Sequence, residues 1–304
     1  MAPPIDPAQE RRLRLPGIAL MCGALACFSC IDASGKFLNL HMDPLQTVWA
    51  RYTSAFFLAL ALFNPITRPA ILVTKRPVLQ IGRSALLLFS TILNFVALQY
   101  LQLDQALAIG FSTPFIVAVL SGPMLNEWIG WRRWIAIGVG FTGVLLVARP
   151  GAGGIHPAAL LSVISATTYA IYIVTTRILA RTDSNETTLF YSNLVGVAAM
   201  LPVMPFVWRA PDSALVIVMM VAIGVFGSVG HYLLIIAHRM APASILAPFI
   251  YSQMLWTTAL GFFVFADVPN RWTLAGAAIV ITSGLYLLYR ERVRGARLAP
   301  LGDD

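Results

Sequence analysis

Ten apolar stretches fill almost the whole of this 304-residue chain, and they constrain its fold more than any motif does. A helix needs about 20 predominantly apolar residues to cross a bilayer. The stretches therefore predict an all-α membrane protein with ten transmembrane helices, at residues 16–38, 45–64, 80–101, 105–125, 134–149, 157–180, 187–208, 214–238, 243–264 and 273–290. So little sequence lies between them that the function is expected among the helices themselves.

The charged residues are few and unevenly distributed. They make up 11% of the chain, whereas a soluble domain carries about 25%. On alternating sides of the predicted helices, 16 of the 21 Lys and Arg residues, Arg83 among them, fall on the side that holds both termini, and 3 fall on the other. Because cytoplasmic loops are enriched in Lys and Arg, both termini are predicted to be cytoplasmic. This placement explains the net charge of +8, and no nucleic-acid partner is expected.

Several kinds of chemistry find no support in the sequence. The three cysteines lie on one predicted helix, and the four histidines are scattered, so no metal site is expected. There is no phosphate-binding G-x-x-x-x-G-K motif, and Gly138, Gly140 and Gly143 spell a dinucleotide-binding pattern inside an apolar helix, where close helix packing is the better interpretation. We therefore expect neither an enzyme nor a bound cofactor.

The chain carries a weak internal repeat. A shift of 140 residues aligns Ser112 with Ser252 and Glu127 with Asp267, each acid following an apolar helix and preceding an aromatic and basic turn. Five predicted helices precede the midpoint and five follow it. Because five is odd, the second copy is predicted to be inverted, which places a binding site near the midplane between the halves. The expected organisation is a tail at 1–15, repeats at 16–149 and 157–290, and a tail at 291–304.

Charged residues inside the first two predicted helices are the first site candidates. Asp32, Lys36 and Arg51 lie within apolar stretches, where a charge costs about 2.5–3.5 kcal/mol and must face protein or water. A rise of about 1.5 Å per residue puts Asp32 and Arg51 at similar depth in the outer half of the bilayer. They are predicted either to line the cavity, with Arg51 holding an anionic group, or to form a structural ion pair. Lys36 can pair with Asp32 or extend outward.

Polar and aromatic side chains in other predicted helices are the remaining binding candidates. Aromatic faces and amide groups suit a planar or amphipathic solute. The candidates are Asn94, Ser112, Tyr169, Tyr172, His231, Tyr251, Gln253 and Trp256. Plain packing is the alternative for the residues of the ninth helix, and an interhelical hydrogen bond is the alternative for His231.

Two prolines lie within predicted helices that correspond under the repeat. Pro114 and Pro248 lack an amide hydrogen, so each should kink its helix. The kinks are expected to shape the cavity or to act as gates, and accommodation of packing is the alternative. Glu127 and Asp267 are predicted to be structural residues at helix boundaries, on the cytoplasmic and external faces respectively.

The chain resembles the EamA family of the drug/metabolite transporter superfamily. The resemblance rests on ALAIGFSTPF at 106–115, LNEWIGWRRWIAIGVGFTGVLLVARPG at 125–151, TTLFYSNLVG at 187–196, APASILAPFIYSQMLW at 241–256 and LAGAAIVITSGLYLLYRER at 274–292. It implies a ten-helix carrier of small organic metabolites in the bacterial inner membrane, with peripheral fifth and tenth helices. It also implies substrates ranging from exported amino acids to imported riboflavin or S-adenosylmethionine.

The leading functional hypothesis is a secondary transporter that moves a small metabolite by alternating access, as an exporter or other carrier of amino acids and similar metabolites. Coupling to protons or to a counter-solute is possible, and the lipid bilayer is the expected surrounding. An importer of a cofactor-like molecule is the alternative. A channel-like facilitator and a membrane-embedded enzyme are remote alternatives.

Overall fold

The computed structural model describes residues 7–62, 68–125, 130–148, 157–180, 182–240 and 246–298, and every regular element in these ranges is helical. Glu127 lies outside the described residues. The elements are α1 (Pro7–Leu38), α2 (Pro44–Leu62), η1 (Pro69–Leu72), α3 (Pro77–Leu98), α4 (Leu103–Gly110), α5 (Thr113–Leu125), α6 (Trp131–Ala148), α7 (Pro157–Leu179), α8 (Asn185–Met200), η2 (Leu201–Val203), α9 (Met204–Val207), α10 (Ala214–Met240), η3 (Ala247–Ser252), α12 (Gln253–Phe265) and α13 (Arg271–Leu298).

Local sequence signals explain where several helices begin. Pro44, Pro77 and Pro157 are the first residues of α2, α3 and α7, where the missing amide hydrogen costs nothing and the fixed φ favours the helix. The Ser184 hydroxyl caps α8 by accepting a hydrogen bond from the Thr187 amide at 3.1 Å. Six helical segments of the described chain are long and apolar enough to cross a membrane, and two shorter apolar helices accompany them. The predicted all-α membrane fold is therefore confirmed at this level.

Two of the predicted membrane stretches are interrupted at equivalent places. The stretch 105–125 divides into α4 and α5 at Phe111 and Ser112, and 243–264 contains η3, a 3₁₀ segment, followed by α12. Helix α5 begins at Thr113 and α12 at Gln253, a difference of 140 residues. The same difference separates the starts of α6, at Trp131, and α13, at Arg271. The register that aligns the two halves of the sequence thus also aligns their helices.

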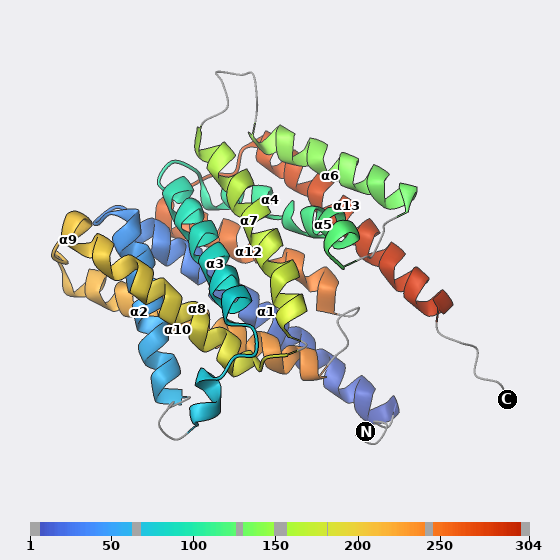
Figure 1. Cartoon of the computed structure of the whole chain (residues 1–304). Coiled ribbons are helices and arrows are strands. Elements are labelled where there is room, and N and C mark those ends of the chain that lie inside the picture. The colour runs from blue at the N-terminus through green and yellow to red at the C-terminus, as the bar shows by residue number, and fades with distance from the viewer. Residues whose placement is uncertain are drawn as a thin grey trace.

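Helices of the first half pack mainly against helices of the second half (Figure 1). Helix α1 packs on α10 and α12, α3 on α7 and α8, α2 on α8 and α10, and α6 on α13. The repeat relates five pairs of elements: α1 to α7, α2 to α8, α3 to α10, α4–α5 to α12, and α6 to α13. If the members of each pair are exchanged, the same set of packing contacts results. The contact of α1 with α12, for example, corresponds to the contacts of α7 with α4 and α5. The two halves therefore interlock as near-equivalent partners.

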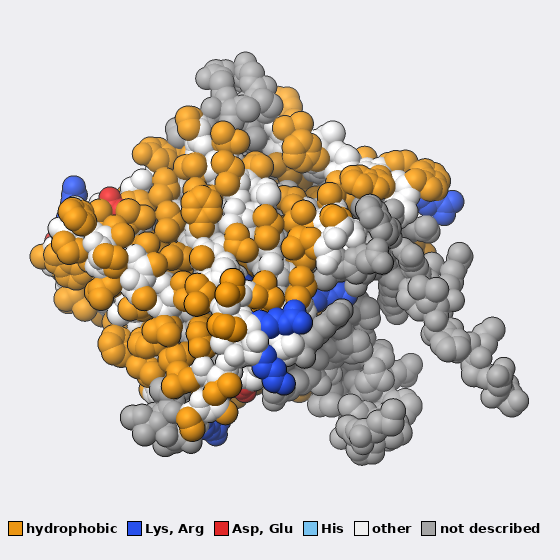
Figure 2. Space-filling view, viewed as in Figure 1, with side chains coloured by type: hydrophobic (Ala, Val, Ile, Leu, Met, Phe, Trp, Pro, Cys, Tyr) orange, Lys and Arg blue, Asp and Glu red, His pale blue; other side chains and the backbone are white. Residues whose placement is uncertain are grey.

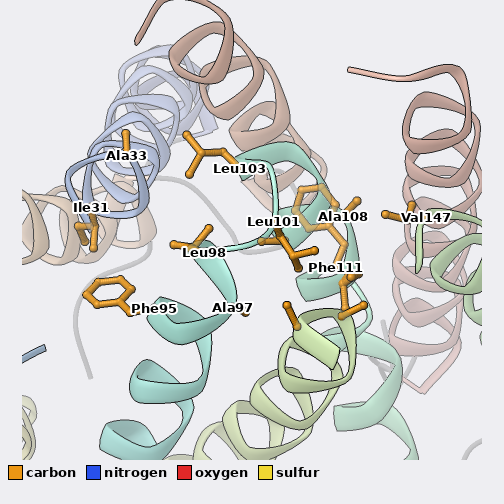
Figure 3. Close-up of a cluster of buried hydrophobic side chains, with 14 of the residues drawn as sticks. Ile31, Ala33, Phe95, Ala97, Leu98, Leu101, Leu103, Ala108, Phe111 and Val147 are labelled. Carbon is orange, nitrogen blue, oxygen red and sulfur yellow. The ribbon is translucent and has the colours of Figure 1, made fainter. Parts of the chain in front are cut away.

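A buried apolar cluster lies where α1, α3, α4 and α6 approach one another (Figure 3). Phe95, Leu98 and Leu103 are at most 1% exposed there. Large apolar side chains also cover the outer surface, such as Val78 at 85% exposed and Phe263 at 82%. Figure 2 shows hydrophobic side chains over most of one face, with Lys and Arg gathered at a few places. Such a surface suits a bilayer, where hydrocarbon takes the place of water.

Glycines let α6 and α13 approach closely. A Cβ on Gly143 would lie 2.8 Å from the Gly276 carbonyl oxygen, and one on Gly276 would lie 2.6 Å from the Gly143 carbonyl oxygen. Gly140 meets the Phe115 ring in the same way, whereas Gly138 faces open space. The glycine pattern that resembles a nucleotide motif thus lies inside a helix and includes two packing positions.

Candidate functional site

Asp32 and Asn94 form the first part of a polar cluster between α1 and α3. Asn94 Nδ2 donates to Asp32 Oδ1 at 3.2 Å, and both side chains are half-buried. Both lie in apolar helices, where their polar groups require partners inside the protein. The sequence identified both as candidates, and the structure brings them together.

Arg51 of α2 takes a neutral partner on α3. Its Nη1 donates to Thr91 Oγ1 at 2.9 Å, and its guanidinium lies 5.2 Å from the centre of the Tyr52 ring. Tyr52 shares the same Thr91 hydroxyl at 3.1 Å. The described ion pairs do not include Asp32 with Arg51, although the two side chains interact electrostatically. The structure therefore holds each charge on a separate neutral partner.

Arg83 is a site residue that the sequence analysis placed on the cytoplasmic side and did not select. It is 3% exposed and buried between α3, α7 and α8, so it is a buried residue of the helix bundle, whichever side of the membrane it lies toward. It donates from Nε to Thr176 Oγ1 at 2.7 Å, from Nη1 to Ser192 Oγ at 2.9 Å and the Thr188 carbonyl at 3.2 Å, and from Nη2 to the Tyr172 hydroxyl at 2.7 Å. Its position three residues inside the predicted stretch 80–101 was the signal that could have found it.

Tyr169 and Tyr172 stack on each other along α7. Their ring centres lie 5.3 Å apart and the planes meet at 20°. Tyr169 keeps 38% of its surface exposed, and it interacts electrostatically with Tyr172, Arg51 and Arg83. His231 of α10 also interacts with both arginines and packs against the Phe28 ring at 5.1 Å. The tyrosine stack thus bonds to Arg83 and interacts electrostatically with Arg51.

Together these residues form one group, here called the central polar cluster: Asp32, Arg51, Arg83, Asn94, Tyr169, Tyr172 and His231. It draws on α1, α2, α3, α7 and α10, and so on both halves of the chain. Its charges rest on neutral hydrogen-bonding partners, and its aromatic rings present flat faces. Such a set can bind a small solute that carries both ionic groups and a ring.

The candidates on η3 and α12 contact other residues than those of the central polar cluster. Tyr251 is 9% exposed and packs edge-on against Phe111 at the break between α4 and α5, with its hydroxyl over Gly284. Gln253 contributes its backbone carbonyl, which accepts from Ser29 Oγ at 3.4 Å. Trp256 is 44% exposed on α12. A binding role for these residues stays a prediction.

The remaining candidates lie at or near the two interruptions of the helices. The Ser112 hydroxyl is buried at the α4–α5 break without a hydrogen-bond partner among the described residues. Pro114 lies two residues after the break, and α4 ends at Gly110, whose carbonyl cannot bond to the proline nitrogen. Pro248 lies in η3, and its side chain is outside the described set. A gating role for the two prolines remains untested.

An ion pair joins the two halves beyond Asp32, one helical turn further along α1. Lys36 Nζ lies 2.6 Å from Asp267 Oδ2, with the two side chains 15% and 20% exposed. The ammonium also lies 5.0 Å from the centre of the Phe265 ring. Of the two alternatives for Lys36, the structure therefore shows neither pairing with Asp32 nor free extension, but a partner from the other half.

Two of the grooves lined by described residues run along the helices. One of about 680 Å³ reaches Arg83 at the start of α3 and is lined by Arg76, Pro77, Val78, Leu79, Gly82, Arg83, Leu86 and Thr175. The other, of about 720 Å³, runs between α6 and α13 and is mainly apolar. Only the first is lined by a residue of the central polar cluster.

Comparison with known proteins agrees with this architecture. An S-adenosylmethionine uptake transporter of Rickettsia conorii is 29% identical, with 91% of this chain and 94% of that protein covered. A riboflavin transporter of Vibrio cholerae is 28% identical over 64% of this chain and 65% of that protein. One crystal structure superimposes with a TM-score of 0.64 at 17% identity, covering 92% of this chain and 99% of that one, and so supports the fold.

The family assignment rests on matches in both halves of the chain. The model of the EamA-like transporter family matches residues 15–149 and again residues 156–290. The relatives and the apolar helices identify a transporter rather than an enzyme, in the bacterial inner membrane with several spans. The chain belongs to the EamA-like transporter family.

Proposed function

We propose that the protein is a secondary carrier that imports S-adenosylmethionine, or a closely related zwitterionic metabolite, by alternating access. The observation that carries the proposal is that Asp32 and Arg51 each hydrogen-bond a neutral partner instead of each other. Because the two opposite charges do not form an ion pair with each other, both are available to a ligand that carries a positive and a negative group. The relatives named for S-adenosylmethionine uptake, which match along nearly the whole chain, favour this substrate.

The chemistry of the substrate fits the cluster group by group. Arg51 is suited to a carboxylate, and Asp32 to an ammonium or sulfonium centre. Tyr169, which keeps 38% of its surface exposed, is suited to stack on a purine and to make a cation–π contact with an onium group. Riboflavin transporters are also relatives, and the tyrosine stack suits a flat ring. A neutral vitamin would leave both charges unused, which favours the zwitterion.

The proposed carrier has ten membrane spans in two inverted halves, with both termini in the cytoplasm. The interlocked packing of equivalent helices and the 140-residue register support this arrangement. Inverted repeats allow a central site to open alternately to each side. Membership of the family does not specify what drives transport. Coupling to protons or to a counter-solute is part of the proposal.

The proposal is tested by uptake of radiolabelled S-adenosylmethionine into cells that express the chain. The wild type should show saturable uptake and counterflow, and Arg51→Ala should lose at least about tenfold of it because a charge-assisted contact is removed. Arg132→Ala is the matched control, since Arg132 is exposed on α6 beside Trp131. Absence of uptake by a well-expressed wild type would reject the substrate, and non-saturating flux would indicate a channel.

A further inference from the structure

Arg83 is a buried cation without an anionic partner among the described residues. Its partners are three hydroxyl groups and one backbone carbonyl, all neutral. Charges inside membrane helices are costly, and they line ligand or ion pathways more often than they have a purely structural role. Arg51 likewise rests on a neutral hydroxyl, so the central polar cluster holds two arginines against one acid, Asp32. This imbalance favours a ligand with an anionic group.

The Tyr172 hydroxyl is the group through which Arg83 can reach a ligand. Its oxygen accepts from Arg83 Nη2 at 2.7 Å, and its own proton has no acceptor within the part of the chain that the structure describes. A hydroxyl that accepts from a cation becomes a stronger donor, because hydrogen bonds in a chain polarise one another. Tyr172 stacks on Tyr169, which keeps 38% of its surface exposed, so the donor lies beside a partly open side chain.

Arg83 and Arg51 both lie near the first residues of their helices, and these helix starts face opposite sides of the membrane on the proposed topology. Arg83 is six residues, about 9 Å, after the start of α3, whereas Arg51 is seven residues, about 10 Å, after the start of α2. On the proposed topology these starts lie on the cytoplasmic and external sides respectively. The groove of about 680 Å³ at the start of α3 reaches Arg83 from its own end of the helix. Arg83 thus bonds directly to Tyr172 of the stack, and Arg51 interacts electrostatically with Tyr169.

We propose that the Tyr172 hydroxyl, backed by Arg83, is a second carboxylate-binding subsite in the cytoplasmic half of the carrier. The inference rests on the proposed function and extends it. The carboxylate of the solute binds Arg51 toward the outside and the Tyr172 hydroxyl toward the inside, and its ring lies against Tyr169. Arg83 acts as a positioning residue, since its guanidinium is fully engaged by the protein.

The test uses a small probe that needs no knowledge of the natural substrate. Benzoate carries a ring and a carboxylate, and benzamide is its neutral match. In purified Arg51→Gln protein, millimolar benzoate should raise the melting temperature while benzamide should not. Adding Tyr172→Phe should weaken benzoate binding about tenfold, because the charge-assisted donor is lost while the ring stack remains.

Ser192→Ala is the matched control, since it also removes one hydroxyl acceptor of Arg83 but leaves Tyr172 in place. If Arg83 only braces the helices, both substitutions should act alike. Equal benzoate effects in the Tyr172→Phe and Ser192→Ala proteins, or no benzoate effect in Arg51→Gln, would overturn the subsite. If Arg51→Gln proves too unstable to purify, the same comparison in the wild-type background decides the matter.

Parallel uptake assays separate the two proposals. A benzoate effect that depends on Tyr172, without S-adenosylmethionine uptake, would reject the substrate and keep the subsite. Uptake without any Tyr172-dependent benzoate effect would keep the substrate and reject the subsite.

Discussion

At the scale of single residues, Asp32 offers the sharpest test of the cluster. It accepts a hydrogen bond from Asn94 and has no ion pair among the described residues, so Asp32→Asn removes the charge with little change in shape. Transport should fall about tenfold or more, because the cationic group of the solute loses its counter-charge, while the melting temperature should change little. Asp212→Asn, an exposed acid paired with His41, is the control. Normal transport by a well-expressed Asp32→Asn protein would remove Asp32 from the binding site.

The residues of the cluster differ in how well the sequence predicts them. Asp32 and Arg51 stand out because a charge in the middle of an apolar stretch has few structural explanations. Arg83 was missed because it lies near the end of its stretch, where long basic side chains commonly extend to the interface. The neutral partners, Asn94 and Thr91, depend on how each helix is rotated about its axis. A membrane helix is apolar on the side that faces lipid and on the side that faces protein. Its hydrophobic periodicity therefore does not show how the helix is rotated about its axis.

At the scale of helices, the contact between α6 and α13 depends on two glycines. Gly143→Ala would drive a methyl group into the Gly276 carbonyl, which should destabilise the protein by about 1–3 kcal/mol through overpacking. Gly138→Ala lies on the same helix with nothing within 4 Å, so it should be neutral or stabilise by up to about 1 kcal/mol. Thermal unfolding of the purified proteins measures both. Equal melting temperatures for the two variants would contradict close packing at Gly143.

The helices themselves were largely predictable, and their interruptions were only partly so. Pro114 predicted a kink, and the structure shows a two-residue interruption, at Phe111 and Ser112, next to the point where the proline removes the bond to Gly110. The 140-residue shift, found from a few residues such as Ser112 and Ser252, matches the starts of two helix pairs. Whether the break acts as a gate is not a property of local sequence, because it depends on the relative energies of two packed states.

At the scale of the whole molecule, the repeat pointed to two halves that meet around a site, and the charge pattern pointed to cytoplasmic termini. The pairing of α1 with α10 and of α3 with α7 requires the three-dimensional arrangement, since no sequence signal says which helices of opposite halves are neighbours. Direction of transport is likewise a property of gradients acting on the whole carrier. The tie between Lys36 and Asp267 is the place where this interlocking can be tested directly.

The Lys36–Asp267 ion pair joins α1 to the segment after α12, one turn beyond Asp32 on the proposed external side. We expect it to hold the external ends of the halves together in this state. Lys36→Asp and Asp267→Lys should each reduce counterflow about tenfold, because each places like charges side by side. The double exchange restores opposite charges and should recover most of the activity. Membrane levels of each variant control for folding. Single variants that exchange substrate at the wild-type rate, or a double variant no better than either single one, would show that the pair does not control the carrier.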